Sequence, residues 1–169
     1  MGATESENLV TSINVNVFFK EFTFYKNEFY SENGKKELEL ADNVLWLDDL
    51  LFIFQTKERN HENSIKGVDS WFKNKILNQA KRQITNSIKY FNKYENILVK
   101  NCRNQLIDVS GANLDNVKKI IIYKVDEQLN EKNKNTKFYE SSLSGNIHLF
   151  NIEDYYHICK YLVTPYEVD

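Results

Sequence analysis

Residues 39–57 read ELADNVLWLDDLLFIFQTK, and this stretch decides the fold because two apolar runs flank a pair of acidic residues. Residues 44–47 and 50–54 are rich in branched and aromatic side chains, which favour strands. Residues 37–40 alternate polar and apolar, so the first strand is expected to begin there and to continue into the first apolar run. Two strands around the turn-tolerant Asp48-Asp49 pair predict a β-hairpin.

The register of this hairpin brings three polar side chains together. If Leu47 pairs with Leu50 across the turn, Asp42 faces Gln55 on the opposite strand. Lys57 lies two residues beyond Gln55, and it therefore projects from the same face of the sheet. Asp42, Gln55 and Lys57 are thus expected to converge at one end of an otherwise apolar surface. A shift of one residue in the register would separate them.

The three side chains have the chemistry of a metal-dependent hydrolase. A carboxylate and an amide oxygen are hard ligands that suit Mg²⁺, and a bound metal activates water and neutralises phosphate charge. A neighbouring lysine such as Lys57 stabilises developing negative charge or orients the attacking water. The alternative is purely structural: Asp42 ends a strand, Gln55 belongs to the ladder, and Lys57 is solvated.

The span resembles the PD-(D/E)XK nuclease superfamily, in the branch whose second motif is Gln-x-Lys. The matching residues are Glu39-Leu40-Ala41-Asp42 and the run from Leu50 to Lys57. Residues 18–57 and the following helix, residues 71–91, also resemble bacterial proteins of that type. The resemblance implies an α/β fold with a central mixed β-sheet flanked by helices, the restriction-endonuclease-like fold. It further implies hydrolysis of phosphodiester bonds, usually in DNA, with Mg²⁺ or Mn²⁺ as cofactor.

The resemblance assigns a role to each residue of the motif. Asp42 would bind the metal, Gln55 would take the place of the second acidic ligand, and the Thr56 backbone carbonyl would complete the shell. Lys57 would be the catalytic lysine. Two departures from the family pattern keep open the alternative of an inactive nuclease-fold module that binds nucleic acid or a protein. Ala41 stands where the family has proline, and Gln55 is neutral.

An additional carboxylate would compensate for the missing charge. Many members of the superfamily carry a glutamate on the first helix that faces the metal, and Glu7 is the candidate here, with Glu21 as the second choice. The pattern Thr4-x-x-Glu7 also fits a capping box at the start of a helix, which is the more common role. Strict alternation puts Glu39 on the opposite strand face from Asp42, so Glu39 is expected to be exposed to solvent.

The clearest helix spans residues 69–91 and provides a candidate nucleic-acid surface. Its apolar stripe repeats every four residues, at Phe72, Ile76, Ala80, Ile84 and Ile88. The resemblance implies that Gln83, beside this stripe, contacts the phosphate or orients Lys57, and Gln79 lies one turn earlier. Basic side chains on the other faces are expected to contact phosphates, with a solvated surface as the alternative. They are Lys73, Lys81, Arg82 and Lys89.

Charge is unevenly distributed over the 169 residues, whose net charge is −2. Residues 66–103 carry nine Lys or Arg against two Asp or Glu, whereas residues 1–65 carry six against twelve. A basic middle beside an acidic first third suits a phosphate-facing surface next to a cation-binding cluster. The alternative, and the more common case, is a solvated helix face. The resemblance to the nuclease superfamily implies nucleic acid, usually DNA, as the partner.

The rest of the chain completes an α/β pattern. Helices are expected from Glu5 onward and from Asn151 to about residue 162, and residues 126–137 are expected to form a loop. Strands are expected at residues 22–24, 97–99, 105–109, 117–125 and 147–150. Residues 164–167, Thr-Pro-Tyr-Glu, have the pattern of a helix start. Residues 1–169 are therefore interpreted as a single nuclease-like domain at the N-terminus of a longer protein, which leaves room for a further C-terminal domain.

Composition excludes several classes of protein. With 41% hydrophobic and 27% charged residues, the chain is neither disordered nor fibrous. The longest apolar run, residues 50–54, is far shorter than the about 20 residues of a membrane span, so no membrane partner is expected. The N-terminus lacks a signal-peptide core, and two cysteines are too few for a disulfide framework, so a cytoplasmic location is expected. A homodimer is compatible with a nuclease that cuts both strands.

Overall fold

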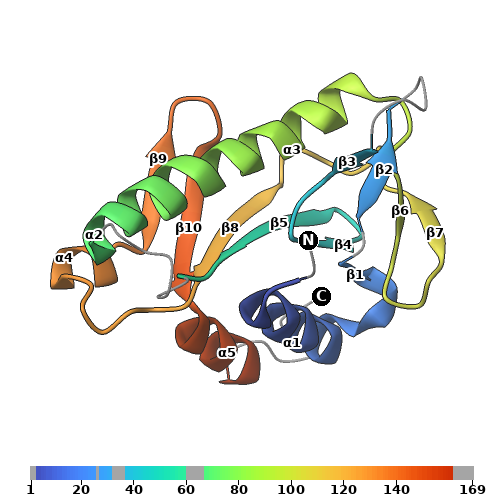
Figure 1. Cartoon of the computed structure of the whole chain (residues 1–169). Coiled ribbons are helices and arrows are strands. Elements are labelled where there is room, and N and C mark those ends of the chain that lie inside the picture. The colour runs from blue at the N-terminus through green and yellow to red at the C-terminus, as the bar shows by residue number, and fades with distance from the viewer. Residues whose placement is uncertain (1–2, 26, 32–36, 60–66, 162–169) are drawn as a thin grey trace.

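The computed structural model describes residues 3–25, 27–31, 37–59 and 67–161. The strands of its main sheet are β1 (Thr23–Phe24), β4 (Asn43–Leu47), β5 (Leu50–Lys57), β8 (Lys118–Tyr123), β9 (Phe138–Ser141) and β10 (Gly145–Asn151). The sheet is mixed, has the order β1-β4-β5-β8-β10-β9, and is covered by helices on both faces (Figure 1). Two small sheets pair β2 (Glu28–Tyr30) with β3 (Glu37–Glu39), and β6 (Leu98–Lys100) with β7 (Leu106–Asp108). The predicted α/β class with a central mixed sheet is confirmed.

The predicted hairpin forms from β4 and β5 in the predicted register. Leu47 pairs with Leu50, and Val44 pairs with Ile53. Asp48 adopts a positive φ of 47° in the turn, a conformation in which Asp is enriched. β5 then runs parallel to β8, and β8 runs parallel to β10. The carboxyl ends of these three strands therefore share one edge of the sheet, which is where ligands commonly bind in α/β folds.

The strand predicted to run through residues 37–47 is interrupted, so that prediction is wrong. β3 pairs with β2 in a sheet of its own, and β4 begins only at Asn43. Asn27 holds the intervening segment, because its backbone carbonyl accepts from Leu40 N at 3.1 Å and its side-chain carbonyl accepts from Ala41 N at 2.9 Å. These bonds replace a ladder partner and turn the chain before it enters β4.

One face of the main sheet is covered by a continuous helix composed of α2 (Val68–Trp71), η1 (Phe72–Ala80) and α3 (Lys81–Lys93) (Figure 1). The middle part, η1, is a π-helix, which has more residues per turn than the about 3.6 of an α-helix. A spacing of four residues lies between the turn of an α-helix and the wider turn of a π-helix, so the predicted stripe stays on the sheet along the combined helix. Its members Phe72, Ile76, Ala80 and Ile84 are fully buried.

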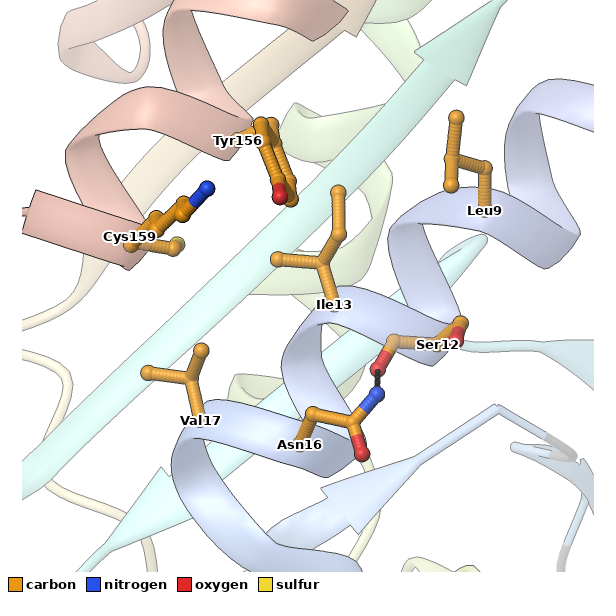
Figure 2. A pocket seen from close by; sticks show the side chains of 8 residues that line it. Leu9, Ser12, Ile13, Asn16, Val17, Tyr156 and Cys159 are labelled. Carbon is orange, nitrogen blue, oxygen red and sulfur yellow. Dashed lines mark hydrogen bonds between the residues drawn. The ribbon is translucent and has the colours of Figure 1, made fainter.

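The other face is covered by α1 (Glu5–Phe22) and α5 (Ile152–Tyr161), both of which the sequence predicts (Figure 1). These helices pack against the alternate side chains of the sheet, such as Phe54. A pocket of about 270 Å³ lies between the two helices, as Figure 2 shows. It is lined by Leu9, Ser12, Ile13, Asn16, Val17, Tyr156, Cys159 and Lys160.

The predicted loop at residues 126–137 contains a short helix, α4 (Glu131–Lys134), so that prediction is wrong there. Asn130 caps this helix by accepting from Asn133 N at 2.9 Å. Asp69 of α2 then accepts from the side-chain amides of Asn130 at 2.6 Å and Asn133 at 2.9 Å. The helix is thus held by a distant residue that no local pattern reveals.

The helix start predicted at residues 164–167 lies outside the described residues. No helix within the described ranges is long and apolar enough to cross a membrane.

Candidate functional site

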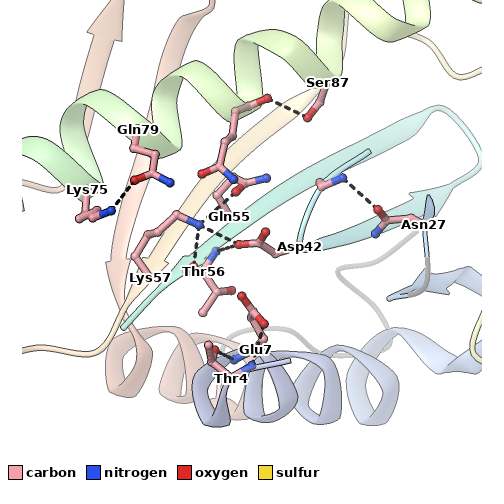
Figure 3. A network of polar contacts seen from close by, with 12 residues as sticks. Thr4, Glu7, Asn27, Asp42, Gln55, Thr56, Lys57, Lys75, Gln79 and Ser87 are labelled. Atoms are coloured by element: carbon pink, nitrogen blue, oxygen red, sulfur yellow. Dashed lines mark hydrogen bonds and ion pairs between the residues drawn. The ribbon is translucent and has the colours of Figure 1, made fainter. Parts of the chain in front are cut away.

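The side chains of Asp42, Gln55 and Lys57 converge in the structure (Figure 3). The Lys57 ammonium donates to Asp42 Oδ2 at 3.0 Å and to Gln55 Oε1 at 3.2 Å. The same ammonium donates to the Thr56 backbone carbonyl at 2.9 Å. Asp42 Oδ2 also accepts from the Thr56 backbone N–H at 2.7 Å. The four residues of the motif therefore form one hydrogen-bonded group, which we call the Lys57 group.

The Lys57 group is largely withdrawn from water. The side chains of Lys57 and Asp42 are 14% and 8% exposed, and Gln55 and Thr56 are buried. Charges in such surroundings must be paired, and each of these two charges pairs with the other. Three oxygens thus surround a single positive charge at one end of β5.

Long-range contacts hold Asp42 in place. Asn43, the first residue of β4, pairs with Phe54, so Asp42 precedes the ladder and is not the direct ladder partner of Gln55 that the sequence predicts. Its side chain instead reaches β5 from the bend before β4. Ser87 of α3 fixes that bend from the helix side by donating to the Leu40 carbonyl.

The Lys57 group has donor chemistry that fits a divalent cation. Its carboxylate, amide oxygen and backbone carbonyl are all hard donors of the kind that Mg²⁺ prefers. They already surround a cation, the Lys57 ammonium, at 2.9–3.2 Å. Within the described residues, no group of three or more His, Cys, Asp or Glu could hold a metal. The site therefore offers one charged ligand, Asp42, beside neutral oxygens.

Glu7 forms the predicted capping box at the start of α1. Its Oε2 accepts from Thr4 N at 2.8 Å, and Thr4 Oγ1 accepts from Glu7 N at 3.2 Å. In Figure 3, Glu7 lies on α1, on the side of β5 toward which Thr56 points. A metal-binding role for Glu7 remains a prediction. Glu21, the second choice, pairs instead with Arg103.

Glu39 is exposed, as predicted, yet it belongs electrostatically to the candidate site. Partial burial raises the pKa of its carboxyl, and the negative charges of Asp42, Glu28 and Glu7 raise it further. Glu28 lies directly opposite Glu39 in the β2–β3 ladder, where like charges repel. The sequence did not predict that Glu28 and Glu39 would face each other, because β2 was not expected. The alternating Glu-Leu-Glu of β3 was the only sequence signal for this acidic pair.

Gln83 of α3 carries a buried polar atom without a partner. Its Oε1 is shielded from water and accepts no hydrogen bond from any described residue, and Thr56 Oγ1 is in the same situation. A buried acceptor without a donor costs about 1–3 kcal/mol. Gln83 Oε1 is therefore suited to accept a hydrogen bond from a water or a ligand.

The basic side chains predicted to bind phosphates differ in their surroundings. Lys73 and Arg82 are exposed. Lys81 lies over the Tyr139 ring, 5.0 Å from its centroid, and its ammonium is 3.4 Å from the Tyr139 hydroxyl. Lys75 donates to Gln79 at 2.9 Å, and Figure 3 shows this pair on η1, on the same side of the sheet as Lys57.

Comparisons of the chain with protein-family models, with curated proteins and with solved structures found no match. A proposal about function therefore depends on the geometry of the Lys57 group and of the surfaces beside it.

Proposed function

We propose that this chain is a metal-dependent nuclease that hydrolyses phosphodiester bonds, with DNA as its expected substrate. On this proposal, the mixed sheet and its helices are the restriction-endonuclease-like variant of the α/β class. The observation that supports this proposal most directly is the placement of Asp42, Gln55 and the Thr56 carbonyl around the Lys57 ammonium. These are the residues of the motif, and they meet between the end of β5 and the bend before β4.

Each residue of the Lys57 group has a defined part in this proposal. Asp42 is the charged ligand of a Mg²⁺ or Mn²⁺ ion, with Gln55 Oε1 and the Thr56 carbonyl as neutral ligands. Such an ion supplies Lewis acidity and lowers the pKa of bound water. Lys57 stabilises the negative charge that develops on a phosphate oxygen. Gln83 accepts a hydrogen bond from the attacking water through its unpartnered Oε1.

The basic face of the long helix would hold the nucleic-acid backbone. Lys73 and Arg82 are exposed and available to phosphates, whereas Lys81 must leave the Tyr139 ring to reach one. Binding through these cations should weaken steeply with salt, because each phosphate contact releases counterions.

Cleavage of supercoiled plasmid tests the proposal. We expect wild-type protein to cut in the presence of Mg²⁺ or Mn²⁺, and Lys57→Met and Asp42→Asn to lose about 10²-fold or more of that activity. Lys132→Met alters an exposed lysine of α4 and is the matched control. Thermal melting of every variant separates loss of activity from loss of fold. Wild-type activity in a folded Lys57→Met variant would refute the proposal.

The second candidate is an inactive nuclease-fold module that binds nucleic acid or a protein partner, and the neutral Gln55 favours it. The single carboxylate of Asp42 is already balanced by Lys57, so the attraction for a divalent ion is weaker than in a site with two carboxylates. Such a module would shift DNA in a gel at low salt and cut nothing. Gln55→Glu restores the missing charge, and cleavage that arises only in this variant would support the inactive module.

A further inference from the structure

A polar pocket of about 500 Å³ lies at the C-terminal end of α1 and is lined by Lys20, Cys102, Arg103 and Gln105. It is an open depression, because Lys20, Arg103 and Gln105 are exposed and Cys102 is half-buried. Glu7 and Lys20 lie near opposite ends of α1, which is kinked at Phe19 (φ 65°). The pocket is therefore separated from the end of α1 that lies beside the Lys57 group.

Asn101 makes the wall of this pocket rigid. Its side chain is buried, and its Oδ1 accepts from the backbone N–H groups of Arg103 and Gln105, each at 3.0 Å. Its Nδ2 donates to the Glu21 carbonyl at 3.0 Å and to Gln105 Oε1 at 2.9 Å. These four bonds fix the turn between β6 and β7 against α1 without any ligand. Such preorganisation lowers the entropic cost of binding.

Several hydrogen-bond acceptors around the pocket are already engaged. Cys102 N donates to the Lys20 carbonyl at 3.1 Å and to the Thr23 carbonyl at 2.8 Å. The Glu21 carbonyl accepts a hydrogen bond from Asn101 Nδ2. Gln105 Oε1 is engaged as well, which leaves the amide NH₂ of Gln105 as a donor. The lining thus offers donors and positive charge.

Glu21 is the one carboxylate that opposes this charge among the residues described around the pocket. It forms an ion pair with Arg103, in which the two side chains are 39% and 55% exposed. A hydrogen bond from its own backbone amide, with a smaller contribution from Arg103, lowers the pKa of the Glu21 carboxyl, so it is ionised at neutral pH. A guanidinium has five N–H donors, and Arg103 therefore keeps donors for a second anion.

We propose that this pocket binds a phosphate group through Lys20, Arg103 and the amide of Gln105. A guanidinium can hold two phosphate oxygens in parallel, and a lysine adds a compact positive charge. Two sources share this chemistry: a small phosphorylated molecule such as a nucleotide, and a phosphate within a nucleic-acid strand. Only the strand source rests on the proposed nuclease function.

Titration calorimetry without divalent metal tests the proposal with three probes: inorganic phosphate, adenosine monophosphate and a short single-stranded DNA. We expect Lys20→Ala and Arg103→Ala to weaken binding about tenfold or more, because each loses a charge-assisted hydrogen bond. Glu21→Gln should tighten binding, because it removes the competing carboxylate. Lys132→Ala is the control for a lysine outside the pocket and should bind as the wild type does.

The probes also distinguish the two sources. Binding of the small phosphates supports a free ligand, whereas binding of DNA alone, with the same dependence on Arg103, supports a strand phosphate. Repeating the titrations in Lys57→Met separates this pocket from the nuclease proposal, because a protein that cuts nothing can still bind phosphate here. The proposal is overturned if no probe binds, or if Arg103→Ala binds each probe as tightly as the wild type does.

Cys102 offers a second readout because its thiol lines the pocket, whereas Cys159 is buried and serves as an internal control. Burial raises the pKa of both thiols, so iodoacetamide should be used at alkaline pH. A bound phosphate should slow alkylation of Cys102 several-fold and leave Cys159 unchanged. Equal alkylation of Cys102 with and without a saturating probe would place that probe elsewhere and overturn the proposal.

Discussion

Asn14→Ala would break a polar chain buried between α1, α5 and β4. Asn14 is fully buried, and its Nδ2 donates to Asn43 Oδ1 at 3.1 Å. Its Oδ1 accepts from the Tyr155 hydroxyl at 2.5 Å. Asn43 continues the chain by donating to Thr11 Oγ1 at 2.9 Å. This chain of hydrogen bonds ties α1 and α5 to Asn43, the residue that follows Asp42. Its loss should therefore destabilise the whole fold.

The size of the effect follows from the groups that lose their partners. Alanine at position 14 leaves Asn43 Oδ1 buried without this hydrogen bond and leaves the Tyr155 hydroxyl with only the weak bond to the Cys159 thiol. An unsatisfied buried group costs about 1–3 kcal/mol, so Asn14→Ala should lower the free energy of unfolding by about 2–4 kcal/mol. Tyr155→Phe leaves Asn14 Oδ1 unsatisfied, removes the contact with Cys159, and should cost about 1–3 kcal/mol. Because the two variants remove the same bond, their effects should not add.

Urea unfolding followed by circular dichroism measures these changes. Asn16→Ala is the matched control, since Asn16 is exposed on the same helix and bonds only within it, to the Ser12 carbonyl. Its stability should stay within about 0.5 kcal/mol of the wild type. A loss below about 1 kcal/mol in Asn14→Ala, or additive effects of Asn14→Ala and Tyr155→Phe, would show that the buried chain does not carry the stability assigned to it.

Three further predictions test the surroundings of the Lys57 group. Glu7→Gln keeps the capping box with Thr4, so the melting temperature should not change; a loss of metal-dependent cleavage at unchanged stability would identify Glu7 as a metal ligand, and unchanged cleavage would leave it as a cap only. Glu39 has a raised pKa in the folded chain, so the folded state binds more protons and stability should fall as pH rises from the usual to the raised pKa. Glu39→Gln should remove that slope and melt higher than the wild type at pH 7, and a lower melting temperature would contradict the sign. Arg59→Met removes the 2.7 Å ion pair with the buried Asp126, which still accepts from Gln128 N, and should cost about 1.5–3 kcal/mol in urea unfolding; adding Asp126→Asn should recover part of the loss, and no recovery would argue against a charge effect.

The hairpin could be predicted because its information is local. Alternation fixes which side chains share a face, and a two-residue turn fixes which residues pair. Leu47 opposite Leu50 then places Gln55 and Lys57 on the side of Asp42, and the structure has this register. The four-residue spacing of the helix stripe was local in the same way, although it did not predict that residues 72–80 form a π-helix.

The features that escaped prediction depend on partners that are distant in sequence. Asn14 meets Asn43 across 29 residues and Tyr155 across 141. A single asparagine inside a helix gives no sign that it will be buried, because its usual place is on the surface. Asn27 likewise redirects the chain before β4 through contacts that no alternation pattern encodes.

The neutral Gln55 has a physical consequence for how the Lys57 group works. Two buried carboxylates side by side would repel each other and resist ionisation, whereas here the charges of Asp42 and Lys57 balance and three oxygens accept from the ammonium. The group is therefore stable without a metal. On the proposed function, Lys57 would reach a substrate phosphate only by giving up part of these contacts, which a cation and the phosphate would together have to replace. Cleavage by the wild type should accordingly need a higher concentration of divalent ion than cleavage by Gln55→Glu. The neutral amide of Gln55 attracts a cation less strongly than a carboxylate would, but it allows the folded protein to be stable without a metal.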